Sequence, residues 1–142
     1  MRSDYGVIEV GRVTSEVVLA NNEDLALASR GALAPENVRR VRAKGIVDTG
    51  ANHVVLPKMI ADQLGLPIHG HATVRYADNR TVVKQLSLEV AGREGTFRAI
   101  VEPDRDSVLI GVLVLEDLDL IVDPGRETLV PRDPEHFTSV VE

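Results

Sequence analysis

Residues 46–51 read Ile-Val-Asp-Thr-Gly-Ala, and the interpretation of the whole chain starts from this stretch. Two apolar strand residues deliver Asp48 into a turn that contains Gly50. A carboxylate at the end of a buried strand is costly unless it is paired, hydrogen-bonded or protonated. Thr49 can donate a hydroxyl hydrogen bond, and Gly50 lets the backbone approach the carboxylate with an amide donor. On its own, the Asp-Thr-Gly tripeptide is equally compatible with an ordinary turn.

The composition is that of one globular domain. The chain has 142 residues, of which 44% are hydrophobic and 27% are charged, so it can bury a real core. With 16 basic and 22 acidic residues the net charge is −6, so we expect neither nucleic acid nor a membrane surface as a partner. The absence of cysteine excludes disulfides, thiolate metal sites and a cysteine nucleophile. Without a signal-peptide pattern or a long apolar run, a cytoplasmic location is expected.

Apolar periodicity and turn residues predict a mostly β chain with two or three short helices. Strands are expected over residues 7–10, 13–19, 38–47, 73–76, 81–90, 96–101, 108–110, 120–122 and 128–130. Helices are expected over residues 22–30, where Asn22 is the expected cap, over 57–64, where Pro57 takes the first position, and over 112–118. Hairpin turns are expected at 77–80, 92–95 and 123–125. Residues 1–37 are assigned to the same domain as the core, 38–131, and residues 132–142 to a tail. From Pro131 onward the polar chain is expected to be loose or ordered only by a partner.

Four features of the chain resemble the retropepsin-like aspartic proteases, the single-domain relatives of retroviral proteases, and especially their bacterial members. The resemblance runs from about Val38 to Pro131. The four features are the active-site loop at 46–51, the segment 54–57 leading into a helix that ends at 64–66, the hairpin around Asp78-Asn79 at the position of the family's flap, and the apolar-apolar-Gly signature at 108–111.

The resemblance implies a closed β-barrel or sandwich with its active site at the two-fold axis of a homodimer. It implies an aspartic endopeptidase acting on peptide or protein substrates without a cofactor or metal. The residues it assigns are Asp48 as the catalytic group, Thr49, Gly50 and Ala51 as loop support, Tyr76, Ala77, Asp78 and Asn79 as the flap, and Ile110 and Gly111 as the signature before the C-terminal helix.

Aspartic proteolysis needs two carboxylates that share one proton and one water. Like charges this close cannot both ionise, so the ionised carboxylate is the general base and the protonated one binds the peptide carbonyl. The chain contains one Asp-Thr-Gly and no Asp-Ser-Gly, and residues 123–125 form an Asp-Pro-Gly turn. The second carboxylate is therefore expected from a second copy of Asp48 in a two-fold dimer, with Thr49 bonding across the axis.

Several residues keep alternative interpretations. The expected flap tip has no glycine, which leaves a non-catalytic dimerisation or peptide-binding module as the main rival to the protease. A structural β domain in which Asp48 is only a turn residue is a weaker rival. Tyr76 can contribute to substrate binding or to cross-strand packing. The basic run 39–44 and the acidic loop 104–107 are interpreted as solvated, and a zinc site formed by His53, His69 and His71 is disfavoured. Val54, Leu109 and Ile110 are expected in the core.

Overall fold

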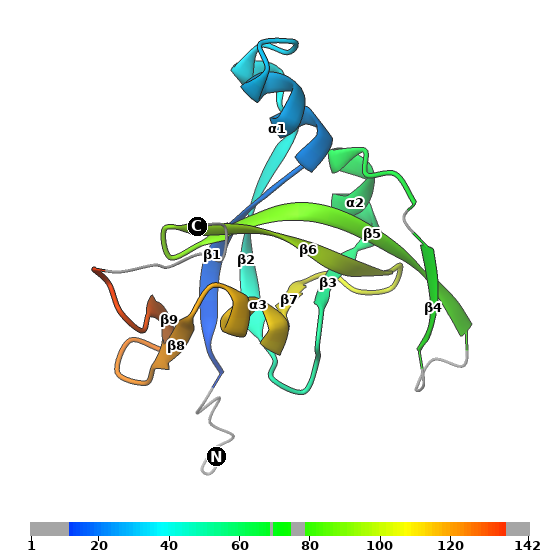
Figure 1. Ribbon diagram of the computed structural model, residues 1–142. Helices are drawn as coiled ribbons and strands as arrows, with labels where there is room; N and C mark the ends of the chain where they lie inside the picture. The colour runs from blue at the N-terminus through cyan, green and yellow to red at the C-terminus, as the bar shows by residue number, and fades with distance from the viewer. Residues whose placement is uncertain (1–11, 69, 75–78, 136–142) are drawn as a thin grey trace.

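The computed structural model describes residues 12–68, 70–74 and 79–135, and these form a mostly β domain (Figure 1). The strands are β1 (Thr14–Ala20), β2 (Arg40–Val47), β3 (Val54–Pro57), β4 (Gly70–Val74), β5 (Asn79–Val90), β6 (Arg93–Glu102), β7 (Val108–Ile110), β8 (Leu120–Asp123) and β9 (Thr128–Pro131). The helices are α1 (Asn22–Ser29), α2 (Lys58–Leu64) and α3 (Val112–Asp117), with a 3-10 turn η1 (Pro35–Asn37). None of the described helices has the length and apolarity needed to cross a bilayer.

Six strands close into a barrel. They follow the order β1-β2-β7-β3-β6-β5, and an additional pairing of β1 with β5 closes the ring. The β2–β7 and β3–β6 pairs are parallel, whereas β1–β2, β3–β7 and β5–β6 are antiparallel. Strand β4 continues the sheet beyond β5, and β8 and β9 form a separate two-stranded sheet. The predicted class, a mostly β closed barrel with short helices, is confirmed.

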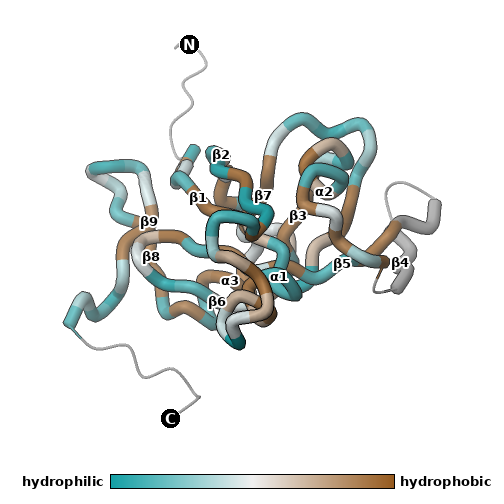
Figure 2. The backbone as a smooth tube through the Cα atoms, turned by 90° about the horizontal axis from the view of Figure 1, so that it is seen from above, coloured by the Kyte–Doolittle hydropathy of each residue, from teal (hydrophilic) through white to brown (hydrophobic). Residues whose placement is uncertain are grey.

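The barrel interior is aliphatic, as the scarcity of aromatic residues predicts. Alternate strand residues point inward, so β1 and β5 each contribute fully buried side chains on one face. Helices α2 and α3 add Leu64 and Val114, both fully buried. Figure 2 shows hydrophobic residues concentrated along the strands and hydrophilic ones on the projecting loops. The barrel is therefore a filled core that holds the connecting loops in place.

The N-cap of helix α1 lies one residue earlier than predicted. Asn21, not Asn22, is the N-cap, because its side-chain oxygen accepts the Asp24 amide at 2.9 Å. The Asn21 amide also donates to the Leu64 carbonyl at 2.9 Å, at the end of α2. The Asp24 carboxylate in turn receives two side-chain bonds from Arg39, at 2.8 and 3.0 Å. This network ties α1 to the end of α2 and to the residue that precedes β2.

Two local predictions need correction. The turn between β5 and β6 is Ala91-Gly92 rather than residues 92–95, since Val90 pairs directly with Arg93. Both turn residues have positive φ, 54° and 79°, which is the geometry of a two-residue type I′ hairpin. Pro57 ends β3 and caps α2 instead of occupying its first position.

The segment expected to be a loose tail is held to the barrel over its first residues. Pro131 ends β9, and Arg132 binds Asp119 through two bonds of 2.7 and 2.9 Å. The Asp133 carbonyl accepts a bond of 2.6 Å from Arg93. The prediction of a loose segment from Pro131 onward is therefore wrong at least as far as Asp133, because buried Arg93 supplies a donor that the sequence pattern does not reveal.

Candidate active site

The parallel pairing of β2 with β7 places Asp48 directly after the end of β2. The Asp48 amide donates to the Ile110 carbonyl at 3.0 Å, and the Val47 amide donates to the Val13 carbonyl at 2.9 Å. The backbone of Asp48 is therefore fixed from two sides of the barrel. Its side chain is half-buried and leaves the sheet where the strands end.

The turn after Asp48 is closed by its own carboxylate. The Gly50 amide donates to Oδ1 of Asp48 at 2.9 Å, and the Ala51 amide donates to the Asp48 carbonyl at 3.0 Å. Thr49 and Gly50 are exposed, while Ala51 is half-buried. A side chain at position 50 would bring its Cβ within 3.2 Å of Oδ1, tighter than an ordinary contact. The turn thus orients the carboxylate and presents its own tip to solvent.

Gly111 lets the Asp48 loop pack against the start of α3. A Cβ at position 111 would lie 2.3 Å from the His53 carbonyl oxygen and 2.6 Å from that of Asn52. The first amides of α3 bind the same loop: Val112 donates to Ala51 at 2.8 Å and Leu113 donates to Asn52 at 3.1 Å. The apolar-apolar-Gly motif therefore has a physical role here, which is to support the loop that carries Asp48.

A cavity of about 350 Å³ opens beside Asp48. Its lining combines the Asp48 loop with side chains from β3, β6, β7 and the loop between β6 and β7. The lining residues are Asp48, Gly50, Ala51, Asn52, His53, Val55, Ile100, Glu102, Arg105 and Leu109. Its size lies within the range of about 300–1,000 Å³ that is common for ligand sites.

Sequence reasoning missed part of this lining. Leu109, expected in the core, is half-buried and faces the cavity, and Val55 lies beside it across the β3–β7 pairing. Arg105, expected to be solvated, binds Glu102 with an Nε–Oε1 distance of 3.0 Å. The period-two pattern could have suggested Val55, because its neighbours Val54 and Leu56 face the core. Nothing in the sequence marks Glu102 and Arg105 as partners in a cavity.

The predicted flap falls largely outside the described residues. Tyr76, Ala77 and Asp78 are among those that the structure does not describe. The backbone of Asn79 begins β5 and pairs with Val74 of β4. The two strands of the predicted hairpin are therefore present, and they lie at the edge of the sheet in Figure 1.

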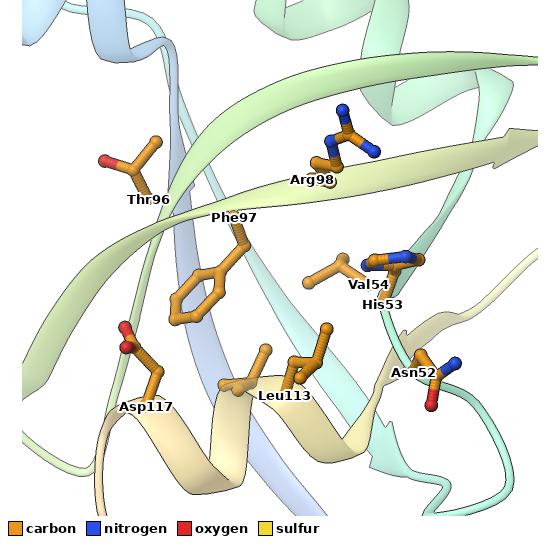
Figure 3. A pocket seen from close by; sticks show the side chains of 9 residues that line it. Asn52, His53, Val54, Thr96, Phe97, Arg98, Leu113 and Asp117 are labelled. Atoms are coloured by element: carbon orange, nitrogen blue, oxygen red, sulfur yellow. The ribbon is translucent and has the colours of Figure 1, made fainter. Parts of the chain in front are cut away.

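A second cavity of about 290 Å³ lies between α3 and β6 (Figure 3). Phe97 points from β6 toward α3 and forms its apolar wall together with Val54 and Val114. Asn52 and His53 line this cavity as well as the one beside Asp48. The two cavities therefore share the Asn52-His53 segment in their linings.

The described part of the chain holds no group of three or more His, Cys, Asp or Glu side chains that could bind a metal ion. His53 lies at the loop between the two cavities. The side chains of His69 and His71, the other members of the disfavoured zinc site, lie outside the described residues.

Comparison with known protein families gives a match to a family of aspartyl proteases. Residues 37–117 match the sequence profile of the family described as "gag-polyprotein putative aspartyl protease". No curated protein sequence was found to match the chain.

Solved structures share the fold at low sequence identity. The retroviral protease-like domain of Ddi1 from Leishmania major is 18% identical, with a TM-score of 0.52, and the match covers 85% of this chain and 90% of that one. The EIAV protease complexed with the inhibitor HBY-793 is also 18% identical, with a TM-score of 0.52 and coverage of 80% and 92%. A retropepsin-like aspartic protease from Rickettsia conorii is 24% identical, with a TM-score of 0.48 and coverage of 79% and 87%.

Proposed function

Because the chain belongs to the retropepsin-like aspartyl protease family, we propose that it is an aspartic endopeptidase in which Asp48 is the catalytic residue. The observation that carries the proposal is the placement of the Asp48 carboxylate. It is oriented by the Gly50 amide at 2.9 Å and lines a cavity of about 350 Å³. A half-buried carboxylate at such a cavity can activate water at a peptide bond.

The second carboxylate of the dyad comes from Asp48 of a second copy. Of the described residues that line the cavity, Glu102 is the other carboxylate, and it is already bound by Arg105. In the dimer, one Asp48 is ionised and takes a proton from the attacking water, while the protonated partner donates a hydrogen bond to the substrate carbonyl. The Asp48 that took the proton from water then donates it to the amine nitrogen, the C–N bond breaks, and the partner Asp48 takes back a hydroxyl proton as the new carboxyl group forms.

Two surfaces of the structure support a dimer. Thr49 and Gly50 are exposed at the tip of the Asp48 turn, so a second copy can approach there. The β8–β9 sheet has two strands, with no third strand paired to it among the described residues. A two-stranded sheet is marginal by itself and offers free edges for pairing. Ile121 on β8 is 43% exposed, as expected for a residue that a partner covers.

The proposed activity is tested by comparing wild type with Asp48→Asn on a diverse peptide library between pH 4 and pH 7. The variant keeps the shape of the side chain but removes the shared proton and the base. We expect it to fold and to lose cleavage by about 10³-fold or more. A statine-type mimic of the tetrahedral intermediate should inhibit wild type. Equal cleavage by both proteins would reject Asp48 as the catalytic group, and no cleavage by wild type would favour a non-catalytic peptide-binding module.

A further inference from the structure

We propose that the Glu102–Arg105 ion pair determines specificity by making the cavity beside Asp48 selective for uncharged substrate side chains. The inference rests on the proposed function, since it concerns the peptide that this cavity would receive. It assigns a role to two residues that the catalytic step does not use.

The pair is held in one geometry by two contacts. Glu102 is the last residue of β6, and its backbone pairs with Pro57 of β3. The Arg105 side chain reaches Oε1 of Glu102 at 3.0 Å, and the Arg105 amide donates to the Glu102 carbonyl at 3.2 Å. The turn and the ion pair therefore fix each other, and both side chains line the cavity.

Burial separates this pair from an ordinary surface pair. The side chains of Arg105 and Glu102 are 29% and 19% exposed, whereas those of Lys58 and Asp62 on α2 are 60% and 57% exposed. Solvent screens a charge less when it is partly buried. Removal of either member therefore changes the net charge beside the cavity by one unit, which a substrate side chain of the opposite sign can offset.

The remaining lining explains the expected preference. Val55, Ile100 and Leu109 supply an apolar wall, and the ion pair cancels its own charge. An apolar side chain can enter this space without losing hydrogen bonds to water. A lysine or glutamate would lose water and find its complementary group already engaged, which disfavours it.

The proposal predicts opposite changes from two single substitutions. Arg105→Gln leaves the Glu102 carboxylate without the guanidinium, so acceptance of a lysine side chain relative to leucine should rise by about tenfold. Glu102→Gln leaves the Arg105 guanidinium, so acceptance of glutamate relative to leucine should rise by about tenfold. The double Gln variant and Arg105→Lys should both retain the preference of wild type for leucine. Because the proteins compared within one assay all carry the same residue at position 48, its contribution cancels in the comparison.

The experiment uses one peptide series in which each residue flanking the scissile bond is replaced in turn by Leu, Gln, Glu or Lys. One arm measures kcat/KM for cleavage, with products located by mass spectrometry. The other arm measures binding of the same peptides to each variant carrying Asp48→Asn, by fluorescence anisotropy. Asp62→Asn is the matched control, because it removes one member of an ion pair that does not line the cavity.

Opposite shifts in the two single variants, absent in the double variant and in Asp62→Asn, support the proposal. An unchanged ranking of Leu, Glu and Lys in both single variants overturns it, and so does failure of every peptide to bind or be cleaved. If binding preferences switch while wild type cleaves nothing, the proposed proteolysis fails and the specificity role stands. If cleavage occurs and no preference shifts, the specificity role alone fails.

Discussion

At the scale of the residue, Gly111 is the described glycine at which an added Cβ would come closest to backbone atoms. Its neighbours are backbone atoms of Asn52 and His53, which cannot rotate away as a side chain can. These two residues follow Asp48 in the same loop, and the carbonyls of Ala51 and Asn52 accept hydrogen bonds from the first amides of α3. A substitution here should therefore affect stability and the candidate active site together.

We expect Gly111→Ala to lower the free energy of unfolding by about 1–3 kcal/mol, because the added Cβ overlaps a carbonyl oxygen 2.3 Å away. The kcat/KM for peptide cleavage should fall by more than the loss of folded protein alone explains, since relief of the overlap displaces the Asp48 loop. Urea denaturation and kcat/KM on one substrate measure the two effects. Gly125→Ala is the control: its Cβ would meet Asp123 Oδ1 at an ordinary 3.5 Å, so a change within about 0.5 kcal/mol is expected. Equal effects of the two substitutions would contradict this account.

Asp24 gives the fold a defined sensitivity to acid. The side-chain hydrogen bonds from Arg39 hold the pKa of Asp24 below its ordinary value of 3.8, although burial opposes this. A carboxyl whose pKa is lowered by folding stabilises the protein above its unfolded-state value and loses that contribution as the pH falls through the folded-state value. The stabilisation should therefore be complete at neutral pH and decline below about pH 4.

Asp24→Asn tests this linkage, because the amide keeps the shape and removes the titration. Between pH 7 and pH 3, wild type should lose more of its free energy of unfolding than the variant. Urea titrations at fixed pH values measure the difference, with Asp48→Asn as a parallel background to separate any contribution of the candidate dyad. Identical pH dependence of wild type and Asp24→Asn would show that the Arg39 bond does not persist in solution.

At the scale of the element, the features set by local sequence pattern were predicted better than those set by contacts between distant segments. Strand β7 and its glycine, helix α3 and the β8–β9 hairpin lie where alternation, apolar runs and Asp-Pro-Gly indicated. The β5–β6 turn was misplaced because Gly92 and Gly95 are equally good turn formers in sequence. Pairing register, which depends on the whole barrel, selects Ala91-Gly92 and leaves Gly95 in β6 against the Phe97 ring.

The candidate site divides in the same way. Asp48 and its turn are recognisable because the chemistry requires those residue types next to each other. Glu102 and Arg105 are three residues apart, but they reach the same cavity as Val55 and Leu109 only after β3, β6 and β7 pair. Contacts between strands that are not neighbours along the chain have no fixed sequence spacing, so no local pattern could have placed all four residues at one cavity.

Arg93 is the charged residue that joins the C-terminal elements to the barrel. It is 7% exposed and donates to the carbonyls of Leu118 at 2.8 Å, Asp119 at 3.0 Å and Asp133 at 2.6 Å. Arg93→Met keeps much of the stem but removes the guanidinium bonds to all three carbonyls, of which Asp119 keeps the bond from the Arg132 amide; the loss should cost about 2–4 kcal/mol. Thermal unfolding measures the loss, with exposed Arg98→Met as the control. Hydrogen exchange should increase first in β8 and β9, and uniform exchange throughout the barrel would contradict the assigned role.

At the scale of the whole molecule, the closed barrel leaves few places where another chain can add. Pairing of β1 with β5 removes the barrel edges, so among the described strands only β4 and the β8–β9 sheet offer an edge for strand addition. The turn that joins β2 to β3 and the β8–β9 sheet both lie at the lower end of the molecule in Figure 1. A single interface at this end could bring two Asp48 turns together while covering β8 and β9.

We therefore expect concentration-dependent dimerisation coupled to activity. In wild type, sedimentation velocity should show a dimer at micromolar concentration, and specific activity should fall on dilution as the dimer dissociates. Thr49→Arg should weaken the dimer by about tenfold or more, because two-fold symmetry places the two new guanidinium groups near each other at the axis. Gln63→Arg adds the same charge on an exposed position of α2 and should leave the dimer unchanged. A monomer with full specific activity at every concentration would exclude the shared dyad, because one chain then supplies the whole catalytic apparatus.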